Sequence, residues 1–206
     1  MEVAVSEYER WEGRYAKPEY EFGTAPNVFL AACKPLLPKS GRLLSVADGE
    51  GRNGVWLAEQ GLDVTAIDFS PTAQKKARAL AAERRVSVDF IQTDVHAWHY
   101  PEAAFDVVVE IFAQFSTPAE RQVKWAAMRR ALKSGGLLIL QGYTPKQLDY
   151  GTGGPKELDR LYTPALLKQT FGDFRDLKIT EEEHEMQEGA AHAGMSAVIG
   201  LTGKKP

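Results

Sequence analysis

Short β-branched or apolar segments alternate with longer helical ones along the middle of this chain, and this alternation constrains the fold more than any other feature. The apolar segments are residues 42–47, 63–68, 86–93, 105–112 and 137–143. The helical segments are the stretch that ends at Gln60, residues 70–84 and residues 118–133. Strands that are apolar throughout are typical of parallel sheets covered by helices on both faces. The pattern therefore predicts an α/β fold with a doubly wound, Rossmann-like sheet.

Turn and cap residues predict where two of the helices begin and end. Ser70 is expected to be an N-cap residue, with Pro71 at the first helical position. Gly135 and Gly136 are expected to end the helix 118–133, because glycine readily adopts the backbone conformation that follows a helix. The next strand would then begin at residue 137.

The two ends of the chain depart from the alternation. The segment before Arg42 is an aromatic-rich arm, and after Tyr143 a polar loop leads to a short helix near residues 164–171. Two long extended stretches follow, at about 174–187 and 195–204, and predict an antiparallel strand pair added to the sheet. We expect a single domain over residues 1–206 with three parts, namely the arm 1–41, a core 42–143 and a C-terminal region 144–206.

Charge and cysteine content exclude several classes of protein. The chain has 25 basic and 28 acidic residues, so it has no basic excess to neutralise a nucleic-acid backbone. A single cysteine, Cys33, can form neither an internal disulfide nor a thiolate zinc site. The most apolar run, GLLILQGY, is far shorter than the ~20 residues that span a bilayer. We therefore expect a cytoplasmic protein that has no nucleic-acid or membrane partner.

The sequence SVADGEGRNG joins the first predicted strand to the following helix. Gly49, Gly51 and Gly54 satisfy the pattern G-x-G-x-x-G, in which glycines let the backbone turn sharply and approach a ligand closely. Asp68 stands at the end of the second strand, where an acid can accept hydrogen bonds from both hydroxyls of a ribose. This arrangement predicts either the NAD(P) site of an oxidoreductase or a site for S-adenosylmethionine.

Two features favour S-adenosylmethionine over NAD(P). Asp94 follows the third strand, where its carboxylate could accept a hydrogen bond from the adenine amino group. In addition, residues 144–206 are too few for the separate substrate domain that many dehydrogenases carry.

The sequence resembles the class I S-adenosylmethionine-dependent methyltransferases over almost its whole length. Their motifs I and II are similar to LLSVADGEGRNGVWLAEQGLDVTAIDFSPTAQKKA, and later signatures are similar to FIQTDV and LKSGGLLIL. The small tellurite-resistance or thiopurine-type branch has ends similar to WEGRYAKPEYEFGTAPNVFL, LYTPALLKQTFGDF and EGAAHAG. The resemblance implies seven strands in the order 3-2-1-4-5-7-6, with the last strand antiparallel. It also implies that the cofactor lies across the C-terminal ends of strands 1 and 2.

The resemblance also implies roles for individual residues. Gly49 and Gly51 would pass under the methionine part of the cofactor, and Asp68 would hold the ribose. The implied cofactor-binding residues are Ala47, Gly49, Gly51 and Asn53 in the loop, Asp68 and Phe69 at the ribose and adenine, Asp94 and Val95 at the adenine edge, and Glu110 and Ile111 at the floor. The chain departs from the family at two positions, because Ser45 stands in place of the usual acid and Ala47 in place of a glycine.

Other residues are candidates for the side of the site that faces the acceptor. His192 lies in a glycine-flanked turn between the last two strands, and its imidazole could take a proton from an acceptor. We expect the aromatic arm to close over the ligand as a lid. The substrate and lid candidates are Trp11, Arg14, Tyr15, Gln114 and Tyr143.

The remaining motifs narrow the chemistry. The sequence contains neither H-E-x-x-H nor C-x-x-C, so no metal site is expected. The fourth strand ends EIFAQF instead of the Asn/Asp-Pro-Pro-Tyr motif of amino-directed methylases, which favours a small-molecule acceptor. We expect methyl transfer to a thiol, a chalcogen or a similar nucleophile by in-line displacement. The alternatives are an NAD(P)-binding oxidoreductase and, because of Ser45 and Ala47, a non-catalytic cofactor-binding protein.

Overall fold

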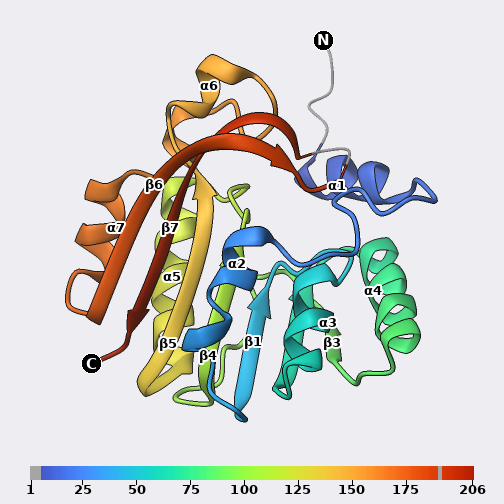
Figure 1. Cartoon of the computed structure of the whole chain (residues 1–206), viewed down its shortest axis with the longest axis horizontal. Coiled ribbons are helices and arrows are strands. Elements are labelled where there is room, and N and C mark those ends of the chain that lie inside the picture. The colour runs from blue at the N-terminus through green and yellow to red at the C-terminus, as the bar shows by residue number, and fades with distance from the viewer. Residues whose placement is uncertain (1–5, 190–191) are drawn as a thin grey trace.

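The computed structural model describes residues 6–189 and 192–206 of the protein (Figure 1). Within these residues seven strands form one sheet in the order β3-β2-β1-β4-β5-β7-β6, as the resemblance implied. The strands are β1 Arg42–Val46, β2 Asp63–Asp68, β3 Asp89–Gln92, β4 Phe105–Ile111, β5 Leu132–Tyr143, β6 Arg175–Gln187 and β7 Ala193–Lys204. Strands β1 to β5 are mutually parallel, whereas β7 is antiparallel to β5 and β6. The fold is that of a Rossmann-like methyltransferase sheet.

Helices cover both faces of this sheet. The helices are α1 Glu7–Tyr15, α2 Val28–Ala32, α3 Arg52–Glu59, α4 Pro71–Arg84, α5 Pro118–Ala131, α6 Gln147–Tyr150 and α7 Pro164–Phe171, with short 3₁₀ helices at Lys34–Leu36 and Leu158–Arg160. In strand β1, Leu43 packs in one core cluster with Leu57 of α3, whereas Leu44 packs in the other with Trp125 of α5. Both faces of the central strands are therefore buried, which explains why these strands are apolar throughout.

Helix α4 begins where the cap residues predicted. The Ser70 hydroxyl accepts a hydrogen bond from the Ala73 backbone N–H, and Pro71 occupies the first helical position. Helix α5 instead ends at Ala131, two residues before the prediction, because Leu132 already pairs with Phe105 in the sheet. The predicted glycine stop at residues 135–136 is therefore wrong, since both glycines lie inside strand β5.

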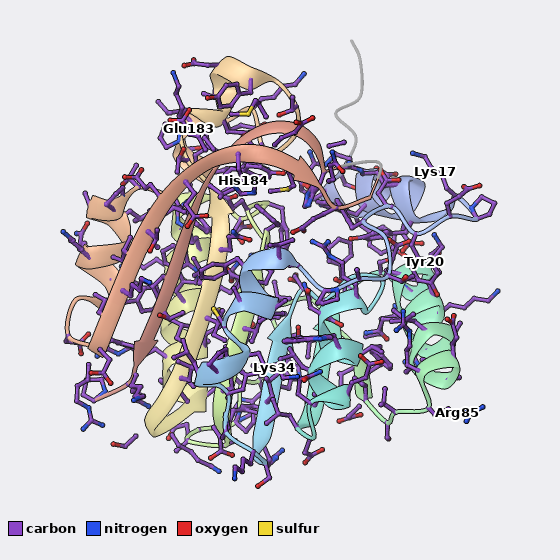
Figure 2. All side chains as sticks on the ribbon, viewed as in Figure 1. Lys17, Tyr20, Lys34, Arg85, Glu183 and His184 are labelled. Carbon is purple, nitrogen blue, oxygen red and sulfur yellow. The ribbon has the colours of Figure 1, made fainter. Side chains whose placement is uncertain are left out.

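The N-terminal arm packs over the C-terminal ends of the parallel strands. In Figure 1 the helix α1 lies beside the tip of the β6–β7 hairpin and above α4. The segment after α1 is attached to α4, since the Tyr20 hydroxyl donates to the Lys76 carbonyl at 3.1 Å (Figure 2). The arm and the C-terminal hairpin therefore meet over the end of β1, where the glycine loop begins.

Gly51 provides a test of how tightly the loop is packed. Its φ of 90° is in the left-handed region, and an added Cβ would stand 2.7 Å from the Ala77 Cβ. We expect Gly51→Ala to lower the free energy of unfolding by about 2–4 kcal/mol, from backbone strain and overpacking together. Urea unfolding measures this change.

Gly13 of helix α1 is the matched control. A Cβ added there would meet nothing within 4 Å. Gly13→Ala should leave the stability unchanged or raise it by up to about 1 kcal/mol, because alanine favours the helix. A Gly51→Ala protein as stable as the Gly13→Ala protein would contradict the packing described here.

Candidate functional site

The loop after β1 is held by two buried carboxylates. The Asp48 Oδ1 atom accepts hydrogen bonds from the Ser45 hydroxyl at 2.6 Å and from the Gly54 backbone N–H at 3.0 Å. Asp68, at the end of β2, accepts one backbone N–H on each carboxylate oxygen, from Gly49 and from Ser70, both at 2.9 Å. Asp68 therefore fixes the glycine loop and the start of α4 to the same carboxylate.

Burial changes the acidity of both groups. Burial raises the pKa of Asp48, against the opposing effect of its hydrogen bond from Ser45. Burial also raises the pKa of Asp68 to about 6, although the two backbone N–H groups oppose the shift. Hydrogen bonds that a ligand donates to such a buried carboxylate stabilise its ionised form.

These carboxylates border a cavity of about 70 Å³, which we call the loop cavity. Six of the predicted cofactor-binding residues line it, namely Ala47, Gly49, Asn53, Asp68, Phe69 and Ile111. Trp11 and Tyr15 of the arm and His192 of the last turn line it as well. The structure thus brings residues from both ends of the chain to the glycine loop.

A second cavity of about 110 Å³ adjoins the first, and we call it the aromatic cavity. It shares with the loop cavity the side chains of Trp11, Phe22, Phe112, Phe115 and His192. The predicted substrate residues Arg14, Gln114 and Tyr143 line only this second cavity. The five predicted substrate and lid residues therefore divide between two neighbouring cavities that have a common wall.

Gln114 has a structural task within this wall. Its side-chain amide donates to the Tyr143 carbonyl at 2.9 Å, and its side-chain oxygen accepts the Tyr143 backbone N–H at 2.5 Å. It also donates to the Arg160 carbonyl at 3.1 Å. Gln114 therefore fixes the loop after β4 to the end of β5.

Glu110 does not line either cavity, so its expected place at the floor of the site is wrong. Its side chain is fully buried, and its Oε2 atom lies 3.0 Å from the Nζ atom of Lys124, which is buried as well. Trp125 and Tyr162 donate hydrogen bonds to its other carboxylate oxygen. A buried carboxylate requires such partners, and α5 supplies two of the three, so the side chain turns into the core.

Gly51, Asp94 and Val95 also lie outside the two cavities. Gly51 caps helix α3 and packs on α4. The Asp94 side chain is 58% exposed, and its Oδ1 atom accepts the His96 backbone N–H at 2.9 Å. Val95 is buried. The role of Gly51 under the methionine part of the cofactor, and those of Asp94 and Val95 at the adenine edge, thus stay predictions.

His192 is buried against aromatic rings. Its ring centroid lies 4.4 Å from that of Phe22 and 4.6 Å from that of Phe112. Burial lowers the pKa of His192 to about 3, and the positive charges of Arg52 and Arg14 lower it further in the same direction. The imidazole is therefore neutral at pH 7 and a weak base, which disfavours the expected role of taking a proton from an acceptor.

The arm is attached to the loop by buried polar contacts. The Glu12 carboxylate accepts hydrogen bonds from the hydroxyls of Ser70 and Thr72 at the start of α4. The Glu21 backbone N–H donates to Glu50 of the glycine loop at 2.8 Å. These contacts place Trp11 and Tyr15 over the loop cavity, as a cover would require.

Several residues that line the two cavities were not among the predicted site residues. Phe112 and Phe115 belong to the segment EIFAQF, and their position directly after a parallel strand is a signal that could have identified them. Arg52 follows the glycine loop directly, and its Nη2 atom lies 2.7 Å from the Glu188 Oε2 atom. Phe22 belongs to the aromatic-rich arm that the sequence predicts to be a lid, but no local pattern distinguishes it from the other aromatic residues of the arm.

Two features are absent from the described residues, a metal-holding cluster and a membrane-spanning helix. Within residues 6–189 and 192–206 there is no group of three or more His, Cys, Asp or Glu side chains that could hold a metal ion. The same part of the chain has no helix that is both long enough and apolar enough to cross a membrane.

The central part of the chain is similar to known methyltransferases. Residues 43–136 match the family model of a methyltransferase domain. The demethylmenaquinone methyltransferase of Thermus thermophilus is 32% identical over 106 residues, which are 50% of this chain and 48% of that protein. The corresponding enzyme of Deinococcus radiodurans is 32% identical over 117 residues, or 56% of this chain and 48% of that protein. The chain spans about half the length of the curated relatives that it matches.

Solved structures of other proteins share the fold. The N-methyltransferase NodS from Bradyrhizobium japonicum, solved with S-adenosyl-L-homocysteine, superposes with a TM-score of 0.74 at 15% identity, over 97% of this chain and 98% of that one. TehB from Haemophilus influenzae gives a TM-score of 0.74 at 17% identity, over 89% of this chain and 63% of that one.

These matches contradict the alternative interpretation of the glycine loop as part of an oxidoreductase. The glycine pattern alone did not distinguish the two classes, because both use it to bring backbone close to a nucleotide. Residues 43–136 of this chain are similar to a methyltransferase domain, and the seven-stranded sheet has the fold of the N-methyltransferase NodS.

Proposed function

We propose that the protein transfers the methyl group of S-adenosylmethionine to a small-molecule acceptor. The observation that carries the proposal is Asp68, which is buried at the end of β2, hydrogen-bonded to the glycine loop and exposed to the loop cavity. In the resemblance described above, an acid at this position holds the ribose. The assignment to the tellurite-resistance or thiopurine-type branch rests on the ends of the chain and stays a prediction.

The residues of the loop cavity fit this cofactor. Gly49 would lie under the methionine part, Asp68 would accept from the ribose hydroxyls, and Phe69 would lie beside the adenine. Asp94 and Val95, just outside the cavity, would contact the adenine edge. The backbone N–H of Gly49 is already bound to Asp68, so the ribose and the loop would share one carboxylate.

The size of the loop cavity implies that the arm moves. The cavity measures about 70 Å³, whereas sites for ligands of cofactor size measure about 300–1,000 Å³. The Tyr15 hydroxyl takes up part of the space, since it lies 3.0 Å from the place of a Cβ on Gly49. Displacement of Tyr15 would enlarge the cavity, which supports the function of the arm as a lid.

S-Adenosylmethionine supplies an electrophilic methyl group on a positively charged sulfur. The acceptor's nucleophilic atom bonds to that methyl carbon as the carbon–sulfur bond breaks, and the electron pair of the broken bond stays on sulfur. The protein's part is to align the two molecules and to exclude water, and the aromatic side chains of the arm and of the β4–α5 loop serve this purpose. His192, which is neutral, would orient the acceptor by a hydrogen bond. A thiol acceptor would bind as the thiolate, having lost its proton to solvent before it enters the site.

The pKa of Asp68 makes the proposal testable. Ribose hydroxyls donate to the ionised carboxylate, so binding requires loss of the proton that Asp68 holds below pH 6. The affinity for S-adenosylhomocysteine should be constant above pH 7 and fall by about tenfold per pH unit below pH 6. Asp68→Asn should bind about 10- to 150-fold more weakly at pH 7 and lose this pH dependence. Titration calorimetry measures both effects.

Asp63 is the matched control for this experiment, because it lies at the other end of the same strand with a side chain that is 79% exposed. Asp63→Asn should bind like the parent at every pH. A folded Asp68→Asn protein with unchanged affinity would remove Asp68 from the site. Tight binding of S-adenosylhomocysteine without turnover across a broad acceptor panel would favour a non-catalytic cofactor-binding protein.

The lid function of the arm gives a separate prediction. Hydrogen exchange of residues 8–23 should slow when S-adenosylhomocysteine binds, because the cofactor would be enclosed between the arm and the glycine loop. Helix α7 lines neither cavity and serves as the internal reference. Equal exchange of the arm with and without the ligand would show that the arm only packs on the body of the protein.

A further inference from the structure

The two adjoining cavities differ in charge. Three carboxylates, those of Asp48, Glu50 and Asp68, and one guanidinium group, that of Arg52, line the loop cavity, so its carboxylates are in excess. The aromatic cavity is lined by no carboxylate among the described residues, and two guanidinium groups, Arg10 and Arg14, border it. The first cavity therefore suits a cation and the second an anion.

Trp11 holds both guanidinium groups at the wall. The Arg10 and Arg14 Cζ atoms lie 5.4 Å and 5.0 Å from the centroid of its ring. Each arginine pairs with one carboxylate, Arg10 with Glu7 at 2.7 Å and Arg14 with Glu21 at 3.2 Å. Because a guanidinium carries five N–H donors, each keeps donors for a further anion.

The positive field also reaches the common wall of the two cavities. Besides burial, the charges of Arg52 and Arg14 lower the pKa of His192. Arg52 is itself paired with Glu188, whose charge, together with burial, raises the pKa of Tyr143. An anion bound beside His192 would face two cationic side chains across an apolar space, where charge interactions are strong.

The shape and lining of the aromatic cavity indicate a flat ligand. Its walls include the rings of Trp11, Phe22, Phe112, Phe115 and Tyr143. Its volume of about 110 Å³ is close to that of the cavity of about 150 Å³ that holds a benzene molecule in an engineered protein. Aromatic walls and this volume suit one six-membered ring.

The same residues carry polar atoms that have no partner. The Trp11 Nε1, Tyr143 hydroxyl and His192 Nδ1 atoms are buried and form no hydrogen bond with the described residues. Buried polar atoms are normally paired, so a ligand that pairs with them gains affinity. All three side chains line the aromatic cavity, which makes a ring with polar substituents a better occupant than a hydrocarbon.

From these observations we infer that the aromatic cavity binds the methyl acceptor, and that the acceptor is a single aromatic ring carrying an anionic group such as a carboxylate. This inference rests on the proposed function, since it places the acceptor beside the cofactor. The anionic group pairs with Arg10 and Arg14, and the ring lies between the aromatic side chains. The acceptor's negative charge then complements the positive sulfur in a space without water, where opposite charges attract strongly.

The test compares ligands that differ in one property. Benzoate, its neutral isostere benzamide and the non-aromatic cyclohexanecarboxylate are titrated into the protein saturated with S-adenosylhomocysteine, with NMR chemical shifts as the readout. We expect benzoate to bind at least about tenfold more tightly than either of the other two, because only benzoate is both flat and anionic. Equal affinity for benzoate and benzamide would overturn the inference.

Variants of the arm locate the anion. Arg14→Gln and Arg10→Gln should each weaken benzoate binding by about 10-fold and leave benzamide binding unchanged. Arg10 is 46% exposed at its side chain, so its substitution is tolerated by the fold even if that of Arg14 is not. Lys34→Gln is the matched control, because Lys34 carries the same charge in the N-terminal arm, is exposed and lines neither cavity. A Lys34→Gln protein that loses as much benzoate affinity as the arginine variants would overturn the inference.

The outcomes separate this inference from the proposed function. Failure of S-adenosylhomocysteine to bind would reject the proposed function itself. Normal binding of S-adenosylhomocysteine without preference for benzoate would reject only the acceptor class. Competition between benzoate and S-adenosylhomocysteine would place the ring in the loop cavity and would also overturn the inference.

Discussion

The turn that follows strand β1 is the constraint on which the rest of the structure depends. Ala47, Gly49 and Gly51 all have φ in the left-handed region, so the backbone turns within five residues from strand to helix. The carboxylates of Asp48 and Asp68 accept the N–H groups that this turn leaves free. Burial of both charges is costly, and the raised pKa values express that cost. The protein therefore keeps two buried carboxylates whose ionised forms would be stabilised by a ligand with hydroxyl and cationic groups.

A second buried network closes the site from the two ends of the chain. The Glu188 carboxylate accepts hydrogen bonds from the Asn27 side chain and the Val28 backbone N–H, and it pairs with Arg52 of the glycine loop. Asn27 also donates to the Gln141 side chain at 2.8 Å. The Glu188 carboxylate and the Asn27 side chain thereby join the arm, the start of α3, β5 and the last turn. This joint explains why two cavities with a common wall form where segments distant in sequence meet.

The sequence was informative wherever the physics is local, and it predicted the α/β class and the doubly wound sheet. The strand order came from the resemblance to the methyltransferases and is confirmed. Repeating apolar segments indicated the sheet, and the glycine–acid spacing identified Asp68 at the cavity. Prediction failed where one sequence pattern is compatible with two positions of a side chain, one in the site and one in the core. Glu110 ends a strand as a ligand-binding acid does, yet the cation that it meets is Lys124, far along the chain. Phe22 and Arg10 reach the cavities only through tertiary packing of the arm, which no local pattern encodes.

Ser45, one of the two departures from the family pattern, has a structural reason. Ser45 is buried, and its hydroxyl lies 2.6 Å from the Asp48 carboxylate, to which it donates a hydrogen bond. An acid at position 45 would place a second carboxylate beside Asp48, and two such charges at that distance cannot both ionise. Serine at 45 is therefore the partner that an aspartate at 48 requires. The acid of this loop is retained but stands three residues later, where it lines the loop cavity beside Ala47.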